Sequence, residues 1–157
     1  MTLYEKIYPK EHTRKIIMEE SDSWIKTLKK FDDSVEKNRA LAHVYYIREL
    51  YIFDCCNAEK ACEYYEKIPV NYYSIDLLAE YINALKLCYH FKELIKLSRI
   101  ILSSETEFEM RYLFLRELVD AGMVADGAMT KEEYFDYKKQ LTELLEKEKN
   151  RINSIIP

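Results

Sequence analysis

The sequence predicts an all-helical protein, and three observations lead to that prediction. Only 2 of the 157 residues are glycine, whereas tight β-hairpin turns depend on glycine or Asn-Gly at positive φ. Apolar residues recur at spacings of three, four and seven along most of the chain, as on one face of a helix. Short polar segments that suit helix caps separate these runs. We therefore expect about seven helices in antiparallel hairpins, no strand, and one helical domain over residues 1–157.

The first two helices are predicted over residues 9–31 and 34–54. Pro9 suits the first turn of a helix, where its missing N–H costs nothing. The apolar stripe of the first helix consists of Ile17, Trp24, Leu28 and Phe31. Asp32, Asp33 and Ser34 interrupt this stripe and are the expected caps of the second helix, which is apolar nearly all round its middle. Such a helix is buried on more than one side.

The next two helices are predicted over residues 58–68 and 74–88. Asn57 is the expected cap of the shorter one, and Pro69 ends it because the residue before a proline avoids helical geometry. The polar positions of the longer one form a single narrow stripe, Asp76, Glu80, Asn83 and Lys86. Every other position there is apolar, so we expect this helix to be central.

Three further helices are predicted over residues 91–102, 104–121 and 130–153. The pairs Ser104 with Glu107 and Thr130 with Glu133 are capping boxes that begin the last two. Gly122 marks the expected end of the helix before it. The final helix carries a thin apolar seam between balanced charges, so residues 130–155 are expected to cap the end of the domain.

Two segments show the same internal spacing. Residues 58–69 place a small residue at Ala61, an aromatic at Tyr65 and a proline at Pro69, and residues 91–101 repeat the spacing. Ala61 and Leu94 lie 33 residues apart. Over residues 39–121 the chain resembles the tetratricopeptide-repeat family, whose period is about 34 residues. It departs from that pattern because the repeat's glycine is absent and Leu94 replaces a small residue. A non-repeating helical bundle is the alternative.

The resemblance implies a concave groove, lined by the first helix of each pair, that binds an extended peptide or a partner's helix. The expected groove residues are Asp76, Asn83 and Lys86, with His43 and Tyr46 from the preceding first helix. Asn83 occupies the position at which peptide-binding members often hold the ligand backbone. These residues predict a non-enzymatic protein-interaction module, an adaptor or scaffold whose partner is another protein or peptide.

Tyrosine is abundant, with 14 residues, and three adjacent pairs occur at 45–46, 64–65 and 72–73. Neighbours on a helix point about 100° apart, so one member of each pair could face outward or into a groove. Tyrosine is enriched at protein interfaces. The alternative is that these rings fill the spaces between helices.

Composition and motifs argue against several other functions. The 24 basic and 28 acidic residues leave a net charge of −4, which disfavours nucleic-acid binding. No run is long and apolar enough for a membrane span, and no phosphate loop or catalytic constellation occurs. We therefore expect no enzyme activity, no cofactor, no nucleic-acid partner and no membrane partner.

The four cysteines are interpreted as reduced core residues of a cytoplasmic protein, because the first ten residues are polar and lack a signal-peptide core. A zinc site formed by Cys55, Cys56, Cys62 and either His43 or His90 is the weaker alternative, since no CxxC pair exists. For function, the alternative is a small acidic helical regulator or inhibitor. It would act through its outer surface or as a homodimer formed through the C-terminal helix.

Overall fold

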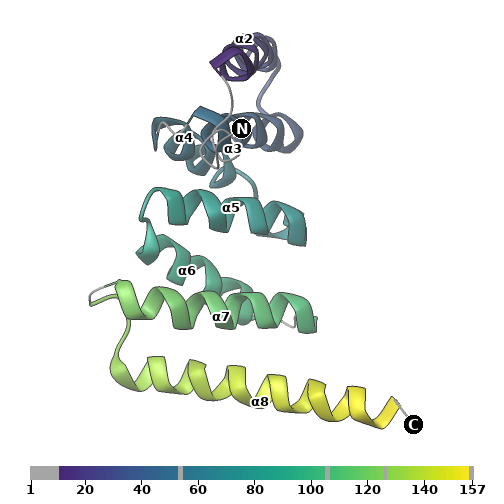
Figure 1. The fold of residues 1–157 in the computed structure, drawn as a ribbon, viewed down its shortest axis with the longest axis vertical. Coiled ribbons are helices and arrows are strands. Elements are labelled where there is room, and N and C mark those ends of the chain that lie inside the picture. The colour runs from purple at the N-terminus through teal and green to yellow at the C-terminus, as the bar shows by residue number, and fades with distance from the viewer. Residues whose placement is uncertain (1–10, 53–54, 105–106, 126, 156–157) are drawn as a thin grey trace, which may run out of the picture. The chain divides into compact units, whose positions relative to one another are not determined.

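The computed structural model describes residues 11–52, 55–104, 107–125 and 127–155 (Figure 1). Within these residues the chain forms seven α-helices, one short 3-10 helix and no strand, which confirms the all-helical prediction. The elements are α2 (Glu11–Leu28), α3 (Val35–Ile52), α4 (Cys55–Tyr65), η1 (Val70–Tyr72), α5 (Ile75–Leu87), α6 (Phe91–Leu102), α7 (Phe108–Val124) and α8 (Lys131–Ile155). The predicted start at Pro9 lies outside the described residues.

The contacts divide the chain into two compact units, Met1–Tyr89 (unit 1) and His90–Pro157 (unit 2). Within unit 1, α2 packs on α3, α3 on α4 and α4 on α5. Within unit 2, α6 packs on α7 and α7 on α8, with α7 and α8 antiparallel (Figure 1). Within each unit, helices that follow one another in the chain therefore pack as neighbours. The interpretation as one domain stays a prediction.

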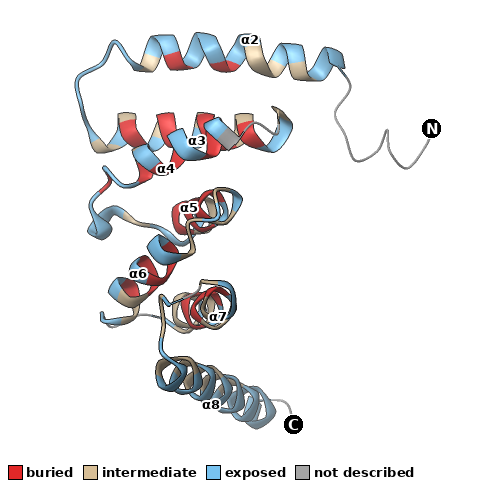
Figure 2. Ribbon diagram, turned by 90° about the vertical axis from the view of Figure 1, so that its left-hand side faces the viewer, coloured by how far each residue is buried: buried red, intermediate tan, exposed pale blue. Residues whose placement is uncertain are grey.

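The core of unit 1 lies between α3, α4 and α5, which carry most of the buried residues of this unit (Figure 2). Tyrosine rings occupy much of it. Tyr45 stacks on Tyr64 with ring centroids 5.8 Å apart, and Tyr65 stacks on Tyr81 at 5.1 Å. Among the three adjacent pairs, only Tyr72 is largely exposed, at 54%. These tyrosines therefore fill the spaces between helices, as the packing alternative stated.

The predicted apolar stripe of the first helix is partly wrong. Trp24 and Phe31 are 58% and 62% exposed, whereas Ser21 and Ile25 are the buried residues of α2. Among the described elements α2 packs chiefly against α3, so only a narrow strip of its surface is covered. The larger apolar side chains lie beside that strip, outside the contact with α3, and therefore stay exposed.

Polar side chains cap several helix starts, and Ser34 and Thr130 are among the caps predicted from the sequence. The N–H of Lys37 donates to Ser34 Oγ over 3.1 Å, and the N–H of Leu77 donates to Ser74 Oγ over 3.3 Å. Both bonds of the second capping box form: the Thr130 N–H donates to Glu133 Oε2 over 2.9 Å, and the Glu133 N–H donates to Thr130 Oγ1 over 3.1 Å. Polar side chains thus satisfy amide groups that a helix start leaves without a partner.

Two predicted caps are wrong. Asn57 lies inside α4, which begins at Cys55, and the residue is only 5% exposed. Ser104 follows the end of α6, and its Oγ donates back to the Ile101 carbonyl over 2.8 Å. The next helix begins after Glu107, whose side chain makes no capping bond. A hydroxyl near a helix end can satisfy a free carbonyl as well as a free amide, and here it satisfies the Ile101 carbonyl.

Unit 2 has its core between α6 and α7, where Leu94, Ile95, Phe114, Leu115 and Leu118 are almost fully buried. Helix α7 continues through Gly122 to Val124, so the predicted end at Ala121 is three residues short. A Cβ at Gly122 would lie 2.8 Å from the sulfur of Met129, so glycine permits the close approach of this side chain. Helix α8 is the longest, with 25 residues, and none of them is buried (Figure 2).

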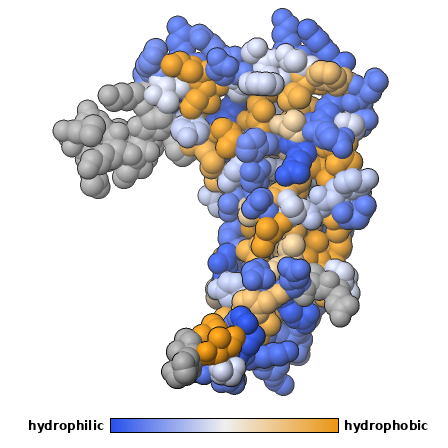
Figure 3. All heavy atoms as spheres, turned by 90° about the vertical axis from the view of Figure 1, so that its right-hand side faces the viewer, coloured by the Kyte–Doolittle hydropathy of each residue, from blue (hydrophilic) through white to orange (hydrophobic). Residues whose placement is uncertain are grey.

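Exposed hydrophobic side chains occur in both units, among them Trp24, Tyr89, Met123 and Phe135. On the face drawn in Figure 3, such side chains lie in patches between strongly hydrophilic ones. None of the described helices has the length and hydropathy that crossing a membrane requires.

Candidate functional site

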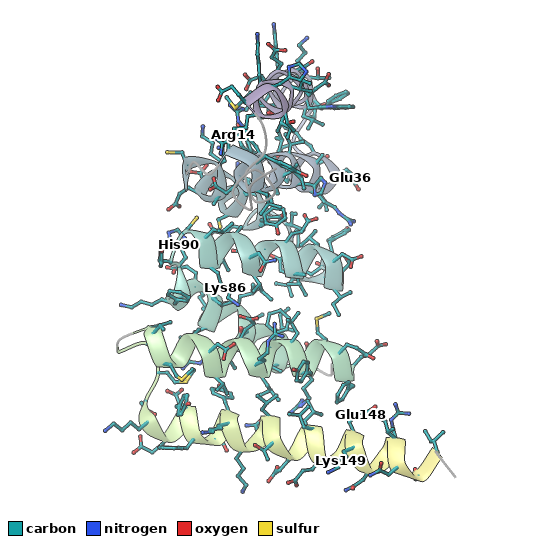
Figure 4. The ribbon with its side chains drawn as sticks, viewed as in Figure 1. Arg14, Glu36, Lys86, His90, Glu148 and Lys149 are labelled. Carbon is teal, nitrogen blue, oxygen red and sulfur yellow. The ribbon has the colours of Figure 1, made fainter. Side chains whose placement is uncertain are left out.

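A groove between α3 and α5 is the candidate site in unit 1. It encloses about 400 Å³ and is lined by Glu36, Arg39, Ala40, His43, Asp76, Leu77 and Glu80. Glu36 lies near the start of α3 (Figure 4). Leu77 is only 3% exposed, while Glu36, Arg39 and Asp76 are exposed. The groove therefore combines a small apolar base with charged walls.

Two polar contacts hold α3 against α5 beside this groove. His43 Nδ1 lies 3.0 Å from both carboxylate oxygens of Glu80. One helical turn further along, Asn83 Nδ2 donates to Tyr46 Oη over 3.3 Å. Both contacts join residues 37 positions apart, so α3 and α5 run parallel where they meet.

The Glu80 carboxylate also receives a hydrogen bond from α4. Tyr65 Oη donates to Glu80 Oε2 over 2.8 Å, and the Tyr65 side chain is fully buried. Burial raises the pKa of the Tyr65 hydroxyl well above its usual value, and the bond to Glu80 raises that pKa further. The Tyr65 hydroxyl therefore stays protonated and donates to Glu80. Side chains from α3 (His43) and α4 (Tyr65) thus hold the Glu80 carboxylate in place.

Two other carboxylates of the groove are not held in this way. Glu36 and Asp76 are exposed, and within the described part of the chain neither makes an ion pair or a side-chain hydrogen bond. Arg39 on the same wall is likewise exposed and has no carboxylate partner among the described residues. These three charged groups remain accessible to a ligand.

The structure brings most of the predicted site residues together. His43 and Asp76 line the groove, and Tyr46 and Asn83 form a hydrogen bond beside it. Tyr46 is only 9% exposed, so it supports the groove more than it presents a surface. Lys86 lies near the end of α5, beyond Asn83, and is not among the residues that line the groove (Figure 4).

Sequence reasoning missed Glu36, Arg39 and Glu80 as groove residues. Glu80 belongs to the recognised polar stripe of α5, and its spacing of four from Asp76 places both on one face. Glu36 and Arg39 lie seven and four residues before His43, so they share a face of α3 with it. Following the α5 stripe between Asp76 and Asn83, and extending the α3 stripe by two turns before His43, would have found all three.

Among the described residues, no group of three His, Cys, Asp or Glu side chains could hold a metal ion. Cys62 is buried, and burial together with its neighbour Cys88 raises the pKa of its thiol. Cys56 is exposed, which contradicts its assignment to the core, and the side chain of Cys55 lies outside the described residues.

Comparison with known proteins gives no relative: no family model, curated protein or solved structure matches this chain.

Proposed function

We propose that this chain is a non-enzymatic protein-interaction module that binds a partner peptide or helix in the groove between α3 and α5. The observation that carries the proposal is this groove itself. It lies between two parallel helices, has exposed charged groups on its walls, and contains His43 and Asp76 at positions expected from the sequence. A tetratricopeptide-like arrangement, in which α3 and α5 are first helices of successive repeats, is part of the proposal.

The site favours binding over turnover. Glu80, His43 and Tyr65 are engaged with one another and hold α3, α4 and α5 together, so they serve as fixed structure. The remaining charged groups, Glu36, Arg39 and Asp76, are exposed on the walls. Exposed charges around an apolar base suit recognition of a peptide's side chains.

A selection from a display library of random peptides tests the proposal with the full-length protein. The variant Ala40→Phe fills the groove, because Ala40 is one of its lining residues. We expect selected peptides to bind this variant at least about tenfold more weakly than the wild type, since the aromatic ring excludes them from the groove.

The matched control is Ala125→Phe, which adds the same ring at the C-terminal end of α7 in unit 2. It should bind the selected peptides as the wild type does. Circular dichroism would establish that both variants are folded. Equal binding by Ala40→Phe and the wild type, or no selection of peptides at all, would contradict the proposal.

The alternative, a regulator that dimerises through its last helix, has one observation in its favour. Helix α8 carries four exposed hydrophobic residues, Phe135, Leu145, Ile152 and Ile155. Phe108 at the start of α7 lines one groove together with Leu144 and Arg151, so the C-terminal part of α8 continues past the start of α7. Ile152 and Ile155, 44% and 64% exposed, belong to this extension.

Sedimentation over a range of protein concentrations tests the alternative. A dimer through this extension should dissociate in the variant Ile152→Ser/Ile155→Ser but not in Asn150→Ser/Asn153→Ser, which changes exposed polar residues of the same turns. A wild type that stays monomeric at all concentrations would rule this dimer out.

A further inference from the structure

A second groove borders the first one on the opposite side of α3. It lies between α2 and α3, encloses about 240 Å³, and is lined by Ile17, Glu20, Ser21, Trp24, His43, Val44, Ile47 and Arg48. His43 lines both grooves. The two grooves are therefore adjacent parts of one surface of unit 1, and His43 forms the wall that they share.

Trp24 gives the second groove an apolar contact surface. Its side chain is 58% exposed, and half-buried Ile17, Val44 and Ile47 line the same groove. Its indole N–H has no hydrogen-bond partner among the described residues. A large rigid ring with a free donor is the kind of residue that contributes most to binding at protein interfaces. The groove therefore suits an apolar side chain of a ligand.

The charged side chains of the two grooves indicate which charge the ligand carries. Of the cations on this surface, Arg48 is already paired with Asp22 over 2.6 Å, and His43 contacts Glu80. Three exposed carboxylates, Glu20, Glu36 and Asp76, have no ion pair among the described residues, against one such cation, Arg39. An excess of unpaired carboxylates gives a negative potential, which attracts a positively charged ligand.

We propose that this surface binds a peptide segment that is both basic and apolar. Its apolar side chain enters the α2–α3 groove against Trp24, and a Lys or Arg side chain lies in the α3–α5 groove beside Glu36 and Asp76. The inference rests on the proposed function and adds the chemistry of the partner together with a second contact region.

Trp24 is the only tryptophan of the chain, so its fluorescence reports directly on the second groove. The probe is a synthetic amphipathic peptide of Leu and Lys without tryptophan, titrated into the full-length protein. We expect a blue shift of the Trp24 emission on binding, because an apolar side chain displaces water from the ring. Two comparison peptides, with Glu in place of Lys or Ser in place of Leu, should bind at least about tenfold more weakly.

Variants identify which charges attract the peptide. Glu36→Gln/Asp76→Asn should weaken binding of the Leu-Lys peptide about threefold to tenfold, and binding should depend less on salt concentration. Glu132→Gln/Glu146→Gln removes the same charge from exposed positions on α8 and should leave affinity within about twofold. Trp24→Ala and Trp24→Phe, measured by anisotropy of a labelled peptide, should weaken binding strongly and slightly, respectively.

The outcomes separate this inference from the proposed function. Equal binding of the Leu-Glu peptide, an unchanged Trp24 emission, or an equal loss in the α8 control variant would overturn the inference. If library peptides depend on Ala40 but lack a basic and apolar pattern, the proposed function stands and the inference fails. If no peptide depends on Ala40, both fail.

Discussion

Glu80 is the residue at which three helices of unit 1 meet. Its carboxylate accepts a hydrogen bond from Tyr65 of α4 and contacts His43 of α3, while its own backbone belongs to α5. The side chains of Tyr65 and Tyr81 stack beside this contact. A polar contact of this kind fixes which residues of α3 and α5 lie opposite each other, whereas apolar packing alone tolerates small shifts.

Replacement of Tyr65 by phenylalanine isolates the hydrogen bond. We expect Tyr65→Phe to lower the free energy of unfolding by about 1–2 kcal/mol, because the ring remains and only the donor to Glu80 is lost. Urea denaturation measures the change. Tyr72→Phe is the matched control. Tyr72 is 54% exposed, so the loss of its hydroxyl should lower the free energy of unfolding by less than about 0.5 kcal/mol. A similar loss in both variants would show that the Glu80 bond contributes little.

Three acids with raised pKa values, buried Cys62 and Tyr65 and half-buried Tyr73, make the free energy of unfolding fall at alkaline pH. Burial raises the pKa of Cys62, of Tyr65 and of Tyr73, the last to about 12. In the unfolded chain, tyrosine ionises near pH 10 and the thiol near pH 8.5, so the unfolded state loses these protons first. Their contribution to stability is complete below those values and falls as pH rises, by about 1.4 kcal/mol per pH unit for each such group.

Urea denaturation at several pH values from about 8 to 11, followed by Trp24 fluorescence, tests this expectation. The slope above about pH 10 should be shallower in Tyr65→Phe, which removes one of the three acids. A stability that is constant over this range would contradict it.

At the scale of elements, local signals decide where helices begin. Thr130 and Glu133 exchange hydrogen bonds at the start of α8, and Glu133 also pairs with Arg99 of α6 over 2.9 Å. The backbone N–H of Thr130, followed by Arg99, lowers the pKa of the Glu133 carboxyl. The capping box thus also connects α8 with α6 within unit 2.

We expect Thr130→Ala to destabilise unit 2 by about 1 kcal/mol, because the N–H of Glu133 loses its acceptor. Thermal unfolding followed by circular dichroism measures it. Ser104→Ala is the control, since Ser104 does not cap a helix start and its loss should cost less than about 0.5 kcal/mol. If Ser104→Ala costs as much as Thr130→Ala, the hydroxyl at position 130 has no special role as a cap.

At the scale of the whole molecule, the contacts form two units, and the boundary along the chain lies between Tyr89 and His90. Tyr89 has φ +58°, a left-handed conformation that usually favours glycine, and it follows the last turn of α5. Such a residue ends a helix abruptly.

Because most contacts lie within a unit, we expect substitutions in one unit to leave the unfolding of the other unchanged. In Thr130→Ala, the circular dichroism transition should shift, whereas the Trp24 fluorescence transition, which reports on unit 1, should not. Equal shifts of both signals would show that the chain unfolds as one cooperative domain.

The sequence by itself determined the all-helical class and the position of nearly every helix. Spacings of three and four residues, and caps such as Ser34 and Thr130, act within a few residues of the chain. They can therefore be recognised in the amino-acid sequence alone. Where two local signals compete, as at Ser104, reading the sequence was not enough.

Only the tertiary structure decided which faces are covered and which residues meet. Trp24 is exposed because few neighbours cover α2, and the number of neighbours is not a property of the helix itself. His43 and Glu80 meet across 37 residues because the packing of α4 sets how α3 lies against α5. The two grooves depend on that arrangement, which long-range packing determines and local patterns do not.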